Sequence, residues 1–253
     1  EQYAYALECA AEHDATLETI ERQVLSIDHC GMLTRALTKW GFSRELFLPL
    51  SLHHATLERM KAGGGLPAAP IIALADRLAA AMLLGDSGNA VLYDARELLT
   101  HIDPPEGELI ASLPQIAQET DSLKLTMAAH ASASDWPDQL QRRRGALKSP
   151  VNALVVGAAS LHPICVFFER ISDRAGVPNL AVLAVRRSAD VPDLLRLLGE
   201  RERAAEASSL PLLAFSTAGD LDLSAVTDRR AAALRLPARI DRVLSACNAL
   251  ISE

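Results

Sequence analysis

Four short, nearly continuous apolar runs follow Pro150, and they constrain the fold of this chain more than any other feature. The runs cover Ala153–Val156, Leu180–Val185, Leu212–Phe215 and Ala231–Leu236. Runs of this length, bounded by turn residues, are typical of strands that are buried on both faces of a sheet. Helical stretches are expected near 163–175, 191–206, 221–230 and 238–251. Strands that alternate with helices predict right-handed crossovers and a parallel sheet.

The first 130 residues have a different periodicity. Apolar residues recur three and four positions apart, as in Leu33, Leu37 and Trp40. This spacing predicts amphipathic helices, each with one apolar stripe. Glycine- and proline-rich segments such as 63–67 are expected to separate one helix from the next. The pattern therefore predicts an all-α region.

A change of composition separates these two regions. The length of 253 residues fits one or two domains at roughly 150 residues each. Residues 132–150 are rich in Ser, Asp, Pro, Arg and Gly, which is typical of a connection between domains. We therefore expect a helical domain at 1–130, a linker at 131–150 and an α/β domain at 151–253.

Negative charge is concentrated in the first part of the chain. The sequence has 25 Lys and Arg residues against 32 Asp and Glu, a formal net charge of −7, and the whole excess precedes Val151. Binding of nucleic acid depends on neutralising phosphates with basic residues. This balance therefore argues against a nucleic-acid partner.

Signals for a membrane or for secretion are not visible in the sequence. No apolar stretch approaches the roughly 20 residues that a membrane span needs, and the beginning of the chain shows no basic region followed by an apolar one. The four cysteines form no closely spaced pair: Cys9, Cys30, Cys165 and Cys247. We interpret them as free thiols in a reducing cytoplasm, and we expect no membrane partner.

Titratable side chains fall on or beside the apolar stripes of three predicted helices: His29, His53, His54 and Asp76. A buried carboxylate without a partner is costly, so Asp76 needs a cation, a donor or a proton. One interpretation is a metal-free network in which Asp76 accepts hydrogen bonds from the histidines. The other is a divalent-metal site formed by all four residues, because imidazole and carboxylate groups are natural metal ligands.

The order of these residues resembles the HDOD family, the HD-related output domains of bacterial signalling proteins. The resemblance covers about residues 1–100 and rests on Glu21, Ile27-Asp28-His29, Leu33, Lys39-Trp40-Gly41, His53-His54 and Ala75-Asp76. It implies an HD-like helical bundle that serves as an interaction module without catalytic activity. The inward histidines and Asp76 would then hold helices together.

The metal-binding dyad of HD phosphohydrolases, which share the HDOD fold, is not in its place here. Those enzymes bind metal through an upstream His, a His-Asp dyad and a late Asp. The resemblance implies that Asp76 is the late Asp and that the three histidines match extra ligands of the HD-GYP branch. The dyad should precede residue 1, and His13-Asp14 has a polar context and lacks the following Gly. We therefore expect either a fragment or a degenerate HD-like domain.

The segment after Pro150 resembles the receiver domain of response regulators, which has a flavodoxin-like fold. The resemblance rests on the order of the segments 179–185, 192–198 and 210–217, followed by Leu236-Pro237. Compared with a receiver domain, the segment between the first helix of this region and Leu180 is too short by about one strand and one helix. Four strands are therefore expected instead of five.

The acidic chemistry of a receiver is missing from this segment. Phosphotransfer needs an acidic pair for Mg²⁺, an Asp acceptor, a hydroxyl and a Lys. The acidic pair matches Gly157-Ala158, the acceptor matches Ala184 and the Lys matches Leu236. Only Ser216 or Thr217 keeps a hydroxyl. The resemblance therefore implies a degenerate receiver that accepts no phosphoryl group.

Together these features predict a non-catalytic bacterial signal-transduction protein of the cytoplasm. We expect it to act through contacts with other signalling proteins and to use no cofactor. The apolar stripe of the helix at 238–251 is a candidate surface for a homodimer, with core packing as the expected use of most of it. The alternative is a metal-dependent phosphohydrolase, a phosphodiesterase acting on a nucleotide or cyclic dinucleotide. Its Fe, Mn or Mg ions would be held by His29, His53, His54 and Asp76.

Overall fold

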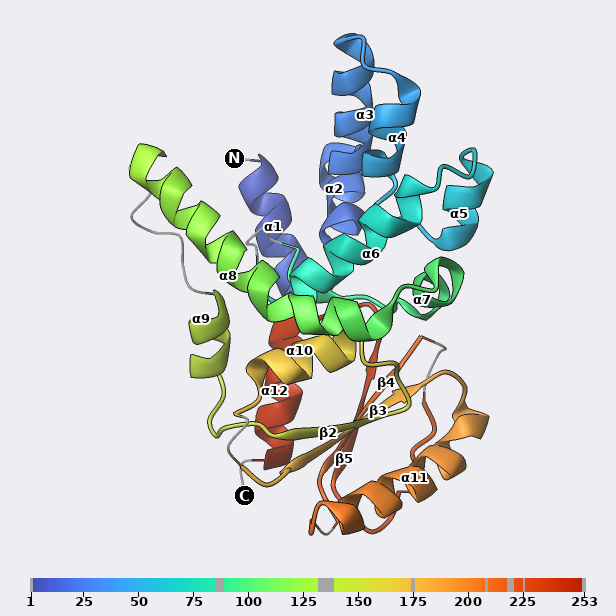
Figure 1. Cartoon of the computed structure of the whole chain (residues 1–253), viewed down its shortest axis with the longest axis vertical. Coiled ribbons are helices and arrows are strands. Elements are labelled where there is room, and N and C mark those ends of the chain that lie inside the picture. Colours follow the sequence, from blue (N-terminus) through green and yellow to red (C-terminus); the bar gives the residue numbers. More distant parts are fainter. Residues whose placement is uncertain are drawn as a thin grey trace.

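The computed structural model describes residues 2–84, 89–131, 139–173, 176–207, 209–217, 221–224 and 226–251 (Figure 1). The first region contains α1 (Gln2–Glu12), α2 (Leu17–Leu25), α3 (His29–Lys39), α4 (Arg44–Ser51), α5 (Leu57–Ala62), α6 (Ala68–Ala81), β1 (Val91–Leu92), α7 (Arg96–Ile102), α8 (Glu106–Ala131) and α9 (Gln139–Gly145). The second contains β2 (Ala153–Val156), α10 (Pro163–Ile171), β3 (Leu180–Val185), a 3₁₀ turn (Ser188–Asp190), α11 (Val191–Ala204), β4 (Leu212–Ser216), β5 (Ala231–Arg235), β6 (Ala238–Arg239) and α12 (Ile240–Ile251). The predicted order, a helical region followed by an α/β region, is confirmed.

The α/β region is built on a four-stranded parallel sheet in the order β2-β3-β4-β5, so the predicted number of strands is confirmed. Successive residues of β3 point to opposite faces. Val182 and Ala184 pack with α10 and α12, whereas Leu183 and Val185 pack with α11. A strand that is covered on both faces needs apolar residues at every position, which explains the continuous runs of β3 and β4. The expectation of burial on both faces is wrong for β5, an edge strand that is mostly exposed.

The helix predicted over 221–230 is wrong for the described residues of that segment. Residues 221–224 and 226–230 contain no helix, and Leu221, Leu223 and Val226 instead pack onto the α11 face of the sheet. The carboxylate of Asp222 accepts a hydrogen bond from the backbone N–H of Ser224 at 2.8 Å. Such a local side-chain bond offers the backbone an alternative to helical hydrogen bonds.

The last helix begins two residues later than predicted. Ala238 and Arg239 form β6, which pairs antiparallel with β1 of the helical region. The apolar stripe of α12, including Val243, Leu244 and Cys247, is buried in the core of the protomer. These residues of the candidate homodimer surface are therefore buried within the chain itself.

The helical and α/β regions share one apolar core. Ala81, Met82 and Leu83 at the end of α6 and Leu92 of β1 lie in the same cluster as the apolar faces of α10 and α12. Helix α10 packs against α6, and α9 packs against α10. Of the predicted linker, residues 132–138 lie outside the described residues, and 139–145 form α9. Among the described helices, none combines the length and apolar character that a membrane span requires.

The helices α3 and α4 form a hairpin that projects away from the sheet (Figure 1). No residue of α3 is fully buried. Apolar side chains of the hairpin and its connection remain exposed: Met32, Trp40, Phe42, Leu46 and Leu50. Trp40 keeps 69% of its surface accessible. The apolar stripes that predicted these two helices are thus only partly used within the protomer.

Candidate functional site

All four predicted site residues lie in one part of the helical region. His29 is the first residue of α3, His53 and His54 lie in the turn after α4, and Asp76 lies on α6. The ring centroids of His53 and His54 are 3.9 Å apart, and that of His29 is 5.5 and 5.1 Å from them. The Nδ1 atom of His54 lies 3.5 Å from a carboxylate oxygen of Asp76. The structure therefore brings the predicted group together.

The local structure around His53 differs from the expected helix. Helix α4 ends at Ser51, because the ring of His53 turns back and donates from Nδ1 to the backbone carbonyl of Leu50 at 2.6 Å. A side chain that satisfies a carbonyl of the last turn is a common way to end a helix. His53 therefore does not lie on the apolar stripe of a helix, contrary to the prediction, and Leu46 and Leu50 of α4 are exposed.

Helix α3 starts at His29 because two carboxylates bind its free N–H groups. Asp28 is the N-cap and accepts from the N–H of Gly31 at 2.7 Å. Burial alone would raise the pKa of Asp28, but this N–H and the guanidinium of Arg22 outweigh it and lower the pKa. Glu21 accepts from both the backbone N–H and the ring Nδ1 of His29, at 2.9 and 2.6 Å. The start of the helix thus fixes the position of the imidazole.

Glu21 is fully buried and holds His29 with one carboxylate oxygen. Its other oxygen, Oε1, is buried and has no hydrogen-bond partner. The ring of His29 donates from Nδ1, so the lone pair of this imidazole is on Nε2. Glu21 supported the family resemblance, but its role beside His29 was not predicted.

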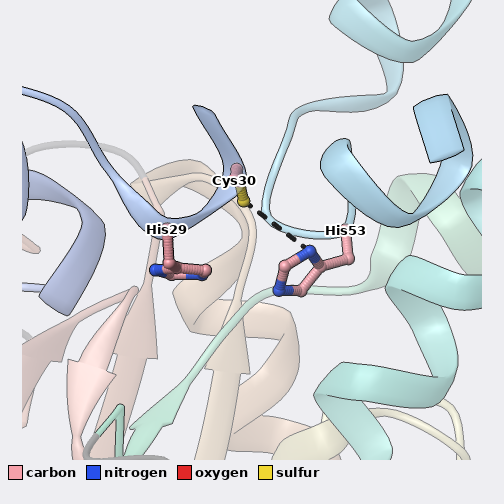
Figure 2. A group of neighbouring side chains, drawn as sticks. All are labelled: His29, Cys30 and His53. Carbon is pink, nitrogen blue, oxygen red and sulfur yellow. Dashed lines mark hydrogen bonds between the residues drawn. The ribbon is translucent and has the colours of Figure 1, made fainter. Parts of the chain in front are cut away.

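Cys30 is a neighbour of His53 that the sequence did not predict. Its sulfur lies 3.7 Å from Nδ1 of His53, and Figure 2 shows the thiol directed at that ring with His29 beside it. Burial, together with the negative charges of Asp28 and Glu18, raises the pKa of the thiol to about 12. A protonated thiol is a poor nucleophile, so the contact with His53 does not make a catalytic Cys–His pair.

Burial also controls the charge of His54 and Asp76. Desolvation lowers the pKa of His54 to about 3, and the nearby rings of His53 and His29 act in the same direction. The imidazole is therefore neutral at physiological pH. Burial raises the pKa of Asp76, while His53 and Arg77 partly oppose that shift. The side chain of Asp76 keeps 38% of its surface exposed, so it is not the isolated core carboxylate that the sequence suggested.

These side chains line a pocket of about 470 Å³ between the helical region and the start of α12. The lining also includes Tyr93, whose ring stacks on that of His54 with centroids 5.6 Å apart. The Tyr93 hydroxyl donates to Glu18 at 2.9 Å and accepts from the side-chain amide of Asn89 at 3.0 Å. Residues distant in sequence, Gln139 and Ile240, complete the wall.

A second polar group lies where the helical region meets the carboxyl end of the sheet. His162, which is fully buried, accepts from the N–H of Ile164 at Nδ1 and donates from Nε2 to Asp94 at 3.1 Å. Arg96 forms an ion pair with Asp94 and donates to the carbonyl of Val185 at 3.2 Å. Burial alone would raise the pKa of Asp94, but the hydrogen bonds from His162 and from the Arg96 backbone lower it to about 2.

The receiver-like positions at this end of the sheet hold no carboxylate. Gly157 has a φ of +86°, and a Cβ there would lie 2.7 Å from the carbonyl oxygen of Ala184. The end of β2 therefore approaches β3 closely and leaves no room for an acidic side chain. Ser216 is buried at the end of β4, and Thr217 lines a cavity of about 610 Å³ together with Arg96.

Comparison of the chain with known protein families, with curated proteins and with solved structures finds no match.

Proposed function

We propose that this chain is a non-catalytic regulatory protein of bacterial signal transduction, located in the cytoplasm, that acts by binding other signalling proteins. The observation that carries the proposal is the projecting α3–α4 hairpin with its exposed apolar side chains. Exposed apolar surface that gathers on one element is typical of protein-interaction sites. The resemblance of this region to HDOD modules points in the same direction.

The carboxyl end of the sheet supports a function without phosphoryl transfer. A phosphoacceptor needs carboxylates that hold Mg²⁺. Gly157 and Ala184 occupy the corresponding positions and lie in close contact. Arg96 reaches the end of β3 from the helical region, so this edge joins the two regions. We propose that the α/β region is a pseudo-receiver that supports the helical region.

The proposal is tested by placing a photo-reactive amino acid at Phe42 in the producing bacterium. We expect a discrete covalent adduct with one partner protein, because Phe42 is 45% exposed on the hairpin. The matched control is Leu197, which is 36% exposed on α11, and it should form no such adduct. The purified partner should reproduce the adduct with the purified full chain, and a Trp40→Ser, Leu46→Ser variant should weaken it. Equal cross-linking at both positions, or none at Phe42, would contradict the proposal.

A metal-dependent phosphohydrolase is the second candidate function, and one observation favours it. His53, His54 and Asp76 each offer a ligand atom within 4.8 Å of the others, at the wall of the 470 Å³ pocket. Two-metal hydrolysis uses ions about 3.5–4 Å apart. Among the described residues, the clusters of side chains that could hold a metal ion contain one carboxylate, that of Asp76. Metal-dependent turnover of a cyclic dinucleotide would establish this candidate.

A further inference from the structure

Three side chains with metal-binding atoms converge where α3 begins and α4 ends. His29, Cys30 and His53 each offer one ligand atom, and these atoms all lie within 4.8 Å of one another (Figure 2). Two of the three come from consecutive residues in the first turn of α3, and the third comes from the turn after α4. This set includes a cysteine sulfur and two imidazole nitrogens.

Each imidazole of this set is held by a partner that leaves one ring nitrogen available. The Glu21 carboxylate binds Nδ1 of His29 at 2.6 Å, and the Leu50 carbonyl binds Nδ1 of His53 at 2.6 Å. Metal-binding histidines typically donate their second N–H to a carboxylate or a backbone carbonyl, which fixes the tautomer and the orientation of the ring. In each neutral ring Nε2 is therefore the nitrogen left for an ion, and the Cys30 sulfur, which lies 3.7 Å from Nδ1 of His53, has to turn towards Nε2 on binding.

The adjoining pocket also contains polar atoms without partners. Nδ1 of His54 and Nε2 of Gln139 are buried and form no hydrogen bond, and both residues line the 470 Å³ pocket. Buried polar atoms in proteins are nearly always satisfied, and exceptions need an explanation such as an ion or an ordered water. His29 and His53 line the same pocket as these two residues, so the unsatisfied atoms point to a ligand in that pocket.

We propose that His29, Cys30 and His53 bind one zinc ion, whose fourth coordination position faces the pocket beside His54 and Asp76. Sulfur and imidazole ligands favour zinc-type ions over Mg²⁺ or Mn²⁺, which prefer oxygen. Zinc–sulfur and zinc–nitrogen bonds of about 2.3 and 2.0 Å place tetrahedral ligand atoms roughly 3.5 Å apart. The ligand atoms now lie within 4.8 Å of one another, so the more widely separated ones have to approach on binding. On binding, the Cys30 thiol loses its proton to solvent as the sulfur–zinc bond forms.

This site does not depend on the proposed regulatory function, because it is defined by ligand atoms and not by a partner protein. It also differs from the Fe, Mn or Mg site expected from the sequence, since Cys30 replaces Asp76 as the anionic ligand. A zinc ion here would join α3 to the turn after α4. The base of the projecting hairpin would then be cross-linked.

Cobalt(II) is the probe, because it occupies zinc sites and reports its ligands in the absorption spectrum. The metal-free full chain is titrated with Co²⁺, followed by competition with Zn²⁺. We expect one equivalent to bind with tetrahedral absorption bands and a sulfur-to-cobalt charge-transfer band. The Cys30→Ser variant should lose the charge-transfer band, and the His53→Ala variant should bind at least about 10-fold more weakly. The controls Cys165→Ser and His101→Ala, at residues outside the ligand groups, should match the unsubstituted chain.

Two outcomes would overturn the proposal. One is that the unsubstituted chain binds no Co²⁺, or binds it without a charge-transfer band. This outcome does not depend on whether any variant folds. The side chains would then form a metal-free hydrogen-bonded cluster. The other is that Cys30→Ser, folded by circular dichroism, retains the band unchanged, which would place the sulfur ligand elsewhere.

Discussion

Asp94 is the residue at which charge and stability are most directly linked. It stays ionised while largely buried because His162 and Arg96 surround it. Its pKa falls from 3.8 to about 2, and a shift of this size corresponds to about 2 kcal/mol. Since the folded-state pKa lies below the unfolded one, the stabilisation is complete above pH about 4 and disappears as the pH falls towards 2.

The Asp94→Asn variant should therefore lose about 2 kcal/mol of unfolding free energy at pH 7. The difference from the unsubstituted chain should shrink between pH 4 and pH 2, because protonation removes the same charge from Asp94. Urea denaturation at several pH values measures it. Asp103→Asn is the control, since Asp103 is exposed and Asn tolerates its left-handed backbone. A deficit that is independent of pH would refute this explanation.

Some residues of the candidate site could be predicted from the sequence and others could not. The histidines and Asp76 were singled out by residue type and helical spacing, and the structure brings them together. Their predicted positions on or beside buried helical stripes are only partly correct, because His53 lies in a turn and Asp76 is partly exposed. Cys30 was not predicted, because the cysteines were interpreted only as free thiols; its contact with His53 joins residues 23 positions apart. No local pattern encodes such a contact.

Among the elements, the glycine that follows β2 lies close to the backbone of β3. Gly157→Ala should destabilise the fold by at least about 2 kcal/mol. The reason is that a Cβ would meet the Ala184 carbonyl at 2.7 Å and Leu194 at 3.0 Å, at a φ of +86°. Thermal or urea unfolding measures the change. Gly107→Ala, on α8 with no atom within 4 Å of the added Cβ, should be neutral or stabilising. Equal effects at both glycines would show that the close approach is absent.

The strands could be predicted more reliably than the helix boundaries. A strand buried on both faces needs apolar side chains at successive positions, and this requirement is visible in the runs at 180–185 and 212–215. The segment 221–230 carries apolar residues as well, but local bonds such as that of Asp222 to Ser224 compete with a helix. Propensity and periodicity do not describe that competition.

For the whole molecule, the decisive feature is the core that the helical and α/β regions share. The pairing of β1 with β6 joins Val91 to Arg239 and Leu92 to Ala238, residues separated by almost 150 positions. Two-residue strands have no periodicity to detect, so the sequence predicted two domains and gave no sign of this pairing. The carboxyl end of the sheet, where many α/β proteins bind ligands, is instead joined to the helical region by Arg96 and Asp94.

We propose that the whole molecule regulates other proteins and does not catalyse a reaction. The most direct measurement is hydrolysis of a cyclic dinucleotide by the full chain supplied with Mn²⁺, Fe²⁺ or Zn²⁺. It is compared with a His53→Ala, Asp76→Asn variant whose fold is checked by circular dichroism. We expect no hydrolysis by either protein above that of the metal alone. Multiple-turnover hydrolysis by the unsubstituted chain that the variant lacks would contradict it.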